Sequence, residues 1–325
     1  MRISLPCLVL VGLASSGKSQ MIDITFRVGL LHAPPFTFIA EEEDREGTNA
    51  DFSGFTPDLL NSLVEFAKAD NFNLNLVMSP SPPEYNPAFD LVASDCEEVS
   101  MDPPIPLPPE ECENFDIMAP NYYATAARSL RAGLTPPIQR SSISTIKLKS
   151  SNINSLAQAE AEGGVVCLVE GTFYAGLVQD TYPAAEYVFC PTAGDCKQNL
   201  QDGVCVLDAD DELMLRYAAA QDSSLEVTDD SFSTQYIVYA YKDSLPADDA
   251  RWFEKWMWDA NTNTTNDQLF QKYFSGTSAE DGIDAGCPTC SCDDPLYEFA
   301  SGDEEPNKNS RKGVPGSRRT RGLKG

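Results

Sequence analysis

The chain has 325 residues, of which 42% are hydrophobic and 10% aromatic. A chain of this length and composition can bury one large core or two modest ones, so global disorder is excluded. Its 50 acidic residues outnumber its 23 basic residues, and the formal net charge is −27. Because such a surface repels polyphosphates, we expect no nucleic acid among its partners.

An apolar run near the N-terminus predicts a signal peptide in residues 1–20. The run covers residues 3–14 (ISLPCLVLVGLA), follows Arg2 and precedes small residues, which is the pattern of a secretory signal. It is too short to span a membrane, since about 20 residues are needed. We therefore expect a secreted or extracytoplasmic protein (extracellular, periplasmic or in the lumen of the secretory pathway) with no integral membrane segment after cleavage.

The cysteines and one sequon agree with that compartment. Six cysteines are spread through residues 96–205, and disulfides persist in oxidising compartments. The triplet Asn263-Thr264-Thr265 matches the N-glycosylation sequon. Asn263 is therefore the predicted glycosylation site.

Residues 12–19 (GLASSGKS) match the phosphate-binding loop G-x-x-x-x-G-K-[ST]. Such a loop holds phosphate only when a helix starts at its Lys-Ser and directs its dipole at the ligand. The next residues, QMIDITFRVGLLHAPPF, are rich in β-branched residues and end in a double proline, so they predict a strand. We therefore interpret the loop-like letters as part of the signal peptide and expect no nucleotide and no other cofactor.

The first predicted strand brings two aromatic residues to its carboxyl end. It covers residues 24–31, and a double-proline turn after it leads to Phe36 and Phe38. A helix capped by Thr56 follows and extends to about residue 69. Next come predicted strands at 73–78 and 89–93 and a proline-rich insertion at 99–110.

From residue 155 onward, predicted helices and strands alternate strictly. The helices are expected at 155–161, 172–181, 194–202 and 209–220, and the strands at 165–169, 185–189 and 204–208. This alternation is typical of a parallel sheet covered by helices. A strand at 235–241 and helices at 247–260 and 265–274 complete the folded part, with Trp252 and Trp256 expected in its core.

Seven segments, taken in order, resemble the family 3 extracellular solute-binding proteins, which are related to the ligand-binding domain of ionotropic glutamate receptors. They are FRVGLLHAPPFTF, FSGFTPDLLNSLVEFA, APNYYAT, VVCLVEGTFYAGLV, LQDGVCVLDADDELMLRY, QYIVYAYKDS and DQLFQKYFSG. Together they span about residues 24–275. No single segment is specific, and the likeness rests on their order and spacing.

The resemblance implies an α/β fold of the two-lobed, periplasmic-binding-protein-like type II kind, a clamshell with parallel-rich mixed sheets. Lobe 1 would comprise residues 21–120 and 233–275, and lobe 2 residues 121–232. Residues 276–325 would be a disordered tail with three cysteines and a basic end. Such proteins close by hinge motion on a small polar solute in the interlobe cleft. We therefore expect a monomeric secreted binding protein rather than an enzyme. Whether a membrane transporter or a receptor is its partner is left open.

The resemblance also implies ligand-binding residues at the cleft. Gly171 and Thr172 start a helix after a strand, where backbone amides and the helix dipole favour an anion. Asp211 matches the position that receives a ligand's ammonium group in the family. Both have an alternative structural role, since threonine caps helices and acids favour the first helical turn. The full set is Phe36, Phe38, Ser94, Asp95, Tyr123, Gly171, Thr172 and Asp211.

The residue that usually anchors a ligand's carboxylate is missing. The family commonly places an arginine just before the segment that crosses between lobes, and the matching position here is Glu111. A glutamate offers acceptors where arginine offers donors, so the sequence predicts an acidic cleft rim that favours a cationic or amine-bearing solute. If the proline-rich insertion shifts the alignment, Arg128 or Arg131 replaces the lost anchor.

Three disulfides are expected. In the family the strands at 165–169 and 204–208 are neighbours, which implies Cys167–Cys205. Cys190–Cys196 would close a small loop, and Cys96–Cys112 would staple the proline-rich insertion. The tail holds Cys287, Cys290 and Cys292 with no nearby histidine, and we expect no metal site there.

Two other classes of function fit parts of the sequence. An enzyme on the same scaffold, dehydratase-like or glycan-acting, would need acid–base residues such as His32 or the pairs Glu97-Glu98 and Asp210-Asp211. We predict no catalytic residue, because a lone histidine beside prolines and paired acids in an acidic chain are usually structural. An acidic, divalent-ion-binding extracellular matrix protein would explain the charge but not the seven ordered segments.

Overall fold

The computed structural model describes residues 21–82, 85–93 and 115–274, and all of these belong to one compact unit. Several expectations lie outside the described residues. They are the signal peptide at 1–20, the proline-rich insertion with Ser94, Asp95, Glu111 and the Cys96–Cys112 bridge, and the tail at 276–325.

The described residues form a ten-stranded mixed sheet with two groups of parallel strands. The first group has the order β4 (Phe72–Pro80), β1 (Ile22–Leu30), β5 (Ile117–Tyr123), and the second has the order β10 (Leu207–Asp211), β8 (Val165–Val169), β9 (Glu186–Cys190). Between the groups lie β12 (Phe232–Tyr241) and β7 (Gln139–Leu148), each antiparallel to both of its neighbours. This mixed α/β architecture, rich in parallel pairs, is the predicted fold class.

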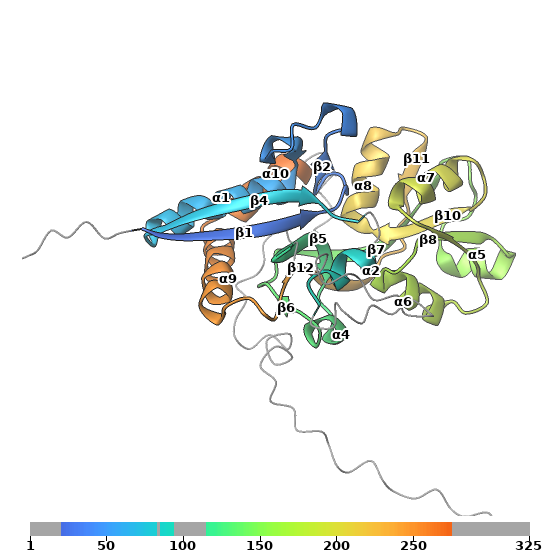
Figure 1. Cartoon of the computed structure of the whole chain (residues 1–325). Coiled ribbons are helices and arrows are strands. Elements are labelled where there is room, and N and C mark those ends of the chain that lie inside the picture. The colour runs from blue at the N-terminus through green and yellow to red at the C-terminus, as the bar shows by residue number, and fades with distance from the viewer. Residues whose placement is uncertain (1–20, 83–84, 94–114, 275–325) are drawn as a thin grey trace, which may run out of the picture. The chain divides into compact units, whose positions relative to one another are not determined.

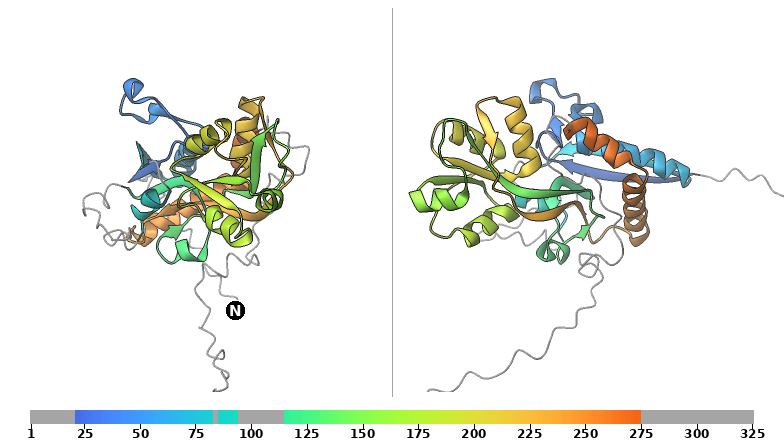
Figure 2. Two further views of the ribbon diagram at one scale, coloured as in Figure 1. Left: turned by 90° about the vertical axis from the view of Figure 1, so that its right-hand side faces the viewer. Right: turned by 180° about the vertical axis from the view of Figure 1, so that it is seen from behind.

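Helices cover both strand groups (Figures 1 and 2). Those beside the first group are α1 (Phe55–Ala69), α2 (Tyr85–Asp90), α9 (Ala247–Thr262) and α10 (Thr265–Phe274); those around the second are α5 (Leu156–Glu162), α6 (Phe173–Thr181), α7 (Ala193–Gln201) and α8 (Glu212–Gln221). Shorter elements are α4 (Ala126–Ser129), β2 (Phe38–Ile39), β3 (Phe52–Ser53), β6 (Gly133–Leu134), β11 (Leu225–Val227) and the 3-10 turns η1 (Glu42–Asp44) and η2 (Asn49–Asp51).

The core beneath the first group follows from simple periodicity. Side chains of β1 alternate between exposed and buried up to Val28, so one face of the strand lies in the core, where Phe26 meets Phe253 of α9 edge to face at 5.5 Å. Helix α1 buries Leu59, Leu60 and Leu63. Trp256 on α9 is fully buried and donates its indole N–H to Asp70 at 3.1 Å. The prediction that the tryptophan-rich helix belongs to the core is thus confirmed for Trp256.

Two disulfides fix the second group. Cys167 on β8 is joined to Cys205, and Cys190 at the end of β9 is joined to Cys196 on α7. These are the pairings expected from the sequence. The sulfur atoms of Cys167, Cys190 and Cys196 lie within 4.8 Å of one another. Because all of them are in disulfides, they are not thiolate ligands for a metal.

Two predicted strands were wrong. Residues 89–93 do not form a strand; α2 ends at Asp90, and the next residues close a turn in which the amide of Val92 donates to the carbonyl of Phe89. A short apolar run cannot be assigned by its pattern alone, because buried helix ends and buried strands look the same. The strand predicted at 204–208 lies instead at 207–211. Its acidic residues are buried in the sheet, whereas the sequence pattern assigned them to a helix start.

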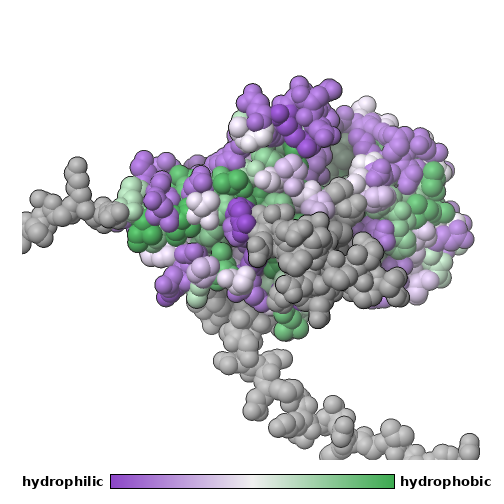
Figure 3. All heavy atoms as spheres, viewed as in Figure 1, coloured by the Kyte–Doolittle hydropathy of each residue, from purple (hydrophilic) through white to green (hydrophobic). Residues whose placement is uncertain are grey.

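On the face drawn in Figure 3, hydrophilic residues gather along the top, and hydrophobic areas lie between hydrophilic ones on both sides. The segment 41–50, which carries η1 and most of η2, is exposed at every residue and is rich in acids. Among the described residues, none of the helices combines the length and the apolar character that a membrane span requires.

The strand register brings the ends of both groups to one place. β5 ends at Tyr123 opposite Ile237, and β10 ends at Asp211 opposite Ile143. Ile143 on β7 and Phe232 on β12 are also paired. The carboxyl ends of the two groups therefore meet the antiparallel strands β12 and β7 from opposite sides. Ligand sites of α/β proteins form at such carboxyl ends.

Candidate functional site

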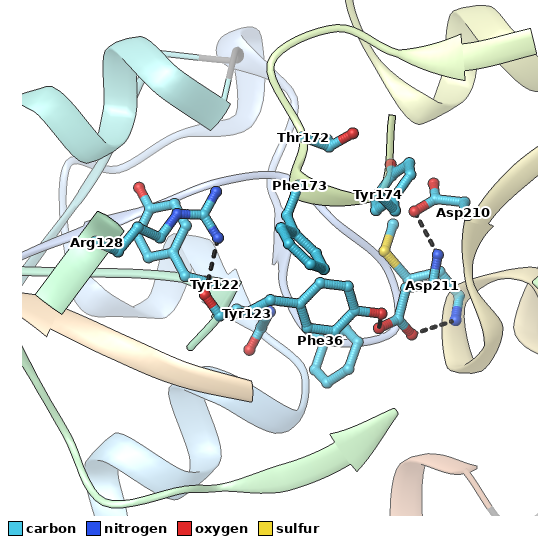
Figure 4. A pocket seen from close by; sticks show the side chains of 11 residues that line it. Phe36, Tyr122, Tyr123, Arg128, Thr172, Phe173, Tyr174, Asp210 and Asp211 are labelled. Carbon is cyan, nitrogen blue, oxygen red and sulfur yellow. Dashed lines mark hydrogen bonds between the residues drawn. The ribbon is translucent and has the colours of Figure 1, made fainter. Parts of the chain in front are cut away.

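A cavity lies at this meeting point and measures about 380 Å³ including its open mouth (Figure 4). One side is made by the turn after β1, the end of β5 and α4; the other side is made by the start of α6, the end of β10 and α8. Its lining residues are Phe36, Asn121, Tyr122, Tyr123, Arg128, Thr172, Phe173, Tyr174, Asp210, Asp211 and Met214. Six of these eleven residues are phenylalanines, tyrosines or a methionine. Most of the wall is therefore a hydrophobic surface with a few polar groups.

Arg128 is the cation of this wall. It projects from α4, its Nη1 donates to the carbonyl oxygen of Tyr123 at 3.0 Å, and its guanidinium lies 4.9 Å from the ring centre of Tyr122 and 5.6 Å from that of Phe89. Stacking and the backbone hydrogen bond fix the plane of the group. The guanidinium thus has a fixed orientation in the wall.

Thr172 begins α6 on the other side of the cavity. Its hydroxyl donates to the carbonyl oxygen of Val169 at 2.7 Å and accepts the amide of Ala175 at 3.3 Å, so the side chain caps the helix. Gly171 before it has φ +73°, a conformation that favours glycine and lets the chain turn sharply from β8 into α6. The capped helix start points its dipole at the cavity.

The carboxylate of Asp211 is bound by the chain's own donors. Its Oδ1 accepts the amides of Leu213 at 2.9 Å and Met214 at 3.4 Å, which caps α8, and its Oδ2 accepts the hydroxyl of Tyr123 at 2.7 Å. Burial raises the pKa of Asp211, while the hydrogen bonds from Tyr123, Ser141 and the two amides act in the opposite direction. Burial and the charge of Asp211 raise the pKa of Tyr123 well above its usual value, so its hydroxyl stays protonated and donates.

Two further acids of β10 are buried beside Asp211. Burial raises the pKa of Asp210 to about 7, although the hydroxyl of Tyr174 and the amide of Asp211, 2.6 Å from its Oδ1, favour the charged form. Asp208 is 3% exposed, and burial followed by the charge of Asp210 raises its pKa well above the usual value. Its Oδ1 has no hydrogen-bond partner among the described residues. Burial therefore favours the neutral form of Asp208.

Aromatic rings separate the charged groups (Figure 4). Phe36 is fully buried and packs against Phe55 and Phe274, with ring centres 5.9 and 5.1 Å away. Tyr123 and Phe173 meet edge to face at 6.1 Å. In the close view, Phe173 and Tyr123 lie between Arg128 at one end and the Asp210–Asp211 pair at the other.

The structure brings together four of the expected ligand-binding residues, namely Phe36, Tyr123, Thr172 and Asp211. Gly171 adjoins the cavity through Thr172 but is not part of its wall. Phe38 is half-buried in β2 and contacts the rings of His32 and Tyr217, away from the wall. Ser94 and Asp95 lie outside the described residues.

Several wall residues were absent from the expected set. Phe173 and Tyr174 follow Thr172 directly, so the helix start that was singled out also carries them. Arg128 appeared only as a possible substitute for the missing anchor, and the structure places it in the wall. Arg131 instead forms a 2.6 Å ion pair with Asp90. His32 accepts the amide of Ile39 at 3.1 Å through Nδ1, which is a turn-stabilising role.

No family model matches the chain, and no curated protein is similar to it in sequence. Solved structures do match. The AvGluR1 ligand-binding domain in complex with glutamate is 15% identical, with a TM-score of 0.63, and the match covers 80% of this chain and 98% of that one. The solute receptor for L-cysteine of Neisseria gonorrhoeae is 16% identical, with a TM-score of 0.61 and coverage of 79% and 93%. An ancestral amino acid-binding protein, a precursor of cyclohexadienyl dehydratase, is 18% identical, with a TM-score of 0.60 and coverage of 77% and 95%.

These matches extend over nearly the whole of each solved chain. The chain has the type II periplasmic-binding-protein fold. The resemblance read from the seven sequence segments is therefore confirmed as a likeness of fold. At such identities the likeness shows the fold alone, because one fold carries many functions.

Proposed function

We propose that the protein is a secreted solute-binding protein that holds one small polar solute in the cavity between two lobes. The carrying observation is the arrangement of Arg128, a capped helix start at Thr172 and a largely aromatic wall around one cavity at the carboxyl ends of both strand groups. Among proteins of this fold are the cysteine receptor and the glutamate complex named above. Two disulfides in the second strand group support an oxidising, extracytoplasmic location.

The proposed lobes are those expected from the sequence, residues 21–120 with 233–275 and residues 121–232. The wall takes Phe36 from the first and Thr172 and Asp211 from the second, while Arg128 follows the first crossing. Only a closed arrangement brings these groups around one solute, so affinity depends on hinge closure.

The solute that fits this wall carries an anionic group. Arg128 offers fixed guanidinium donors, and the start of α6 adds a positive dipole end. We therefore propose a carboxylate- or other anion-bearing solute in place of the cationic solute expected from Glu111.

A thermal-shift screen of the purified protein against a metabolite library tests the proposal. A bound solute raises the melting temperature by mass action. We expect a rise with one class of small anions, a single site by calorimetry, and loss of the rise in Arg128→Gln. Lys149→Gln is a matched control, since Lys149 is exposed and outside the wall. If no library member shifts the wild type, solute binding is wrong.

An enzyme on the same scaffold is the second candidate, and one observation favours it. Asp210 is a cavity residue whose burial raises its pKa to about 7, a value suited to general acid–base chemistry near neutrality. The discriminating measurement is turnover. A solute recovered unchanged after prolonged incubation with stoichiometric protein supports binding, and a product whose formation stops in Asp210→Asn supports the enzyme.

A further inference from the structure

At the acidic end of the cavity, most acceptor sites of Asp211 are taken by donors from the chain itself. An ionised carboxylate has about four lone-pair sites. Asp211 has three donors: the amides of Leu213 and Met214 on Oδ1 and the hydroxyl of Tyr123 on Oδ2. The residue is 7% exposed, so a ligand's ammonium group would have to reach Oδ2 beside the hydroxyl of Tyr123 or displace it.

Displacement of Tyr123 carries a penalty. Its hydroxyl is buried and donates to Asp211 at 2.7 Å, and its ring is held edge to face against Phe173. Loss of that bond would leave a buried donor without its acceptor, which is unfavourable. The tyrosine hydroxyl thus occupies the place on Asp211 that an ammonium group would need.

Asp210 does not substitute for Asp211 as an ammonium partner. Its Oδ1 accepts the amide of Asp211 at 2.6 Å, the hydroxyl of Tyr174 also bonds to it, and the residue is 3% exposed. Burial and the neighbouring acid leave it partly protonated near neutral pH. A partly neutral, enclosed carboxyl is a poor partner for a cation.

We infer that Tyr123 makes the cavity select carboxylic acids that lack an α-amino group, such as 2-hydroxy acids, over the corresponding α-amino acids. The inference rests on the proposed function and names its ligand class. With the ligand's carboxylate directed toward Arg128, a 2-hydroxyl, which both donates and accepts, can pair with the hydroxyl of Tyr123 without demanding a free carboxylate. Selection of this kind acts by excluding the competitor as well as by binding the ligand.

The test uses pairs of acids that differ only at the second carbon. Calorimetric titrations at pH 7.5 compare 2-hydroxyglutarate with glutamate and 3-phenyllactate with phenylalanine. For the pair whose side chain fits the cavity, we expect the hydroxy acid to bind at least 10-fold more tightly than its amino twin. The wild-type ratio alone decides the matter, so the test does not depend on any variant folding well.

Variants then assign the selection to Tyr123. In Tyr123→Phe, one site on Asp211 is open, and we expect the ratio to fall at least 10-fold, mainly through tighter binding of the amino acid. Tyr187→Phe is the matched control, because the Tyr187 hydroxyl bonds to the carbonyl of Tyr182 at 2.6 Å and neither residue is part of the wall. It should keep the wild-type ratio.

The outcomes separate this inference from the proposed function. Tighter binding of the amino acid by the wild type overturns the selection and leaves solute binding intact. If neither acid of any pair binds while the library screen finds a solute without a carboxylate, the inference also fails and solute binding stands. If nothing binds in either experiment, the proposed function itself is wrong.

Discussion

The hydroxyl of Tyr123 and the carboxylate of Asp211 are 88 residues apart in sequence and are joined by a 2.7 Å hydrogen bond. Tyr123 is the last residue of β5, and Asp211 is both the last residue of β10 and the cap of α8. One carboxylate therefore fixes the start of a helix and links the two parallel strand groups at the cavity.

This link predicts a measurable contribution to stability. Tyr123→Phe removes one buried hydrogen bond to a charged group, and we expect the free energy of unfolding to fall by about 1.5–3 kcal/mol. Tyr187→Phe removes a bond to a neutral carbonyl on a half-buried residue and should lower it by about 1 kcal/mol or less. Urea unfolding of both variants checks this. Equal losses would contradict a charged, buried link at Asp211.

The two disulfides should contribute unequally because they close chains of different length. Cys167–Cys205 spans 38 residues and Cys190–Cys196 spans 6. Loop-closure entropy gives about 4 kcal/mol for the longer loop and about 2 kcal/mol for the shorter. We expect Cys167→Ala with Cys205→Ala to lower stability more than Cys190→Ala with Cys196→Ala, as measured by denaturant unfolding without reductant. The reverse order would show that strain or packing, not chain entropy, dominates.

The fold could be predicted where the pattern of residues is strong. The strand at 165–169 and the helix at 265–274 have the bounds that were predicted. The strand is a valine-rich apolar run within a strict alternation of helices and strands, and the helix has a helical apolar stripe. β7 was missed altogether. Its sequence, QRSSISTIKL, is polar, yet most of it is buried because it lies in the centre of the sheet with strands on both sides.

The site was harder to predict for a different reason. Asp211 was expected to bind a ligand, and its alternative role in the first turn of a helix was also recognised; the structure shows that it caps α8. What the sequence could not show is the partner, since Tyr123 reaches Asp211 only through the register of β12 and β7. Arg128 joins the wall by the same long-range pairing, and no local pattern marks it.

Gly54 lies against the backbone of Phe36, a residue of the cavity wall, and its replacement should be disruptive. It has φ +116°, and an added Cβ would lie 2.6 Å from the carbonyl oxygen of Phe36. That carbonyl accepts the amide of Thr56 at 2.8 Å, so neither atom can move without shifting the start of α1. We expect Gly54→Ala to lower the unfolding free energy by more than 3 kcal/mol and to weaken solute binding through Phe36.

Gly47→Ala provides the matched control. Gly47 also has a positive φ, +70°, but no atom lies within 4 Å of an added Cβ. It should therefore show only the backbone penalty of about 1–2 kcal/mol and normal solute binding. Similar losses in both variants would mean that the contact with Phe36 does not matter.

Asp210 should make stability fall as the pH rises. Burial raises its pKa to about 7 from the model-peptide value of 3.8, so the folded protein binds this proton more tightly than the unfolded chain does. The stabilisation is fully present below about pH 4 and is lost as the pH rises through about 7. Asp208 and Asp211, whose pKa values are also raised by burial, act in the same direction.

Asp210→Asn keeps the shape of the neutral side chain and an acceptor for the Asp211 amide. The stability of this variant should therefore fall less steeply with pH, and its melting temperature should exceed that of the wild type at pH 8. Asp222→Asn is the control, because hydrogen bonds from Ser224 lower the pKa of Asp222 and its effect appears only below about pH 4. Calorimetric melting of the three proteins between pH 4.5 and 8 gives the comparison. A wild type whose melting temperature rises across this range in parallel with Asp210→Asn would show that Asp210 is ionised in the folded protein without penalty, contrary to its burial on β10.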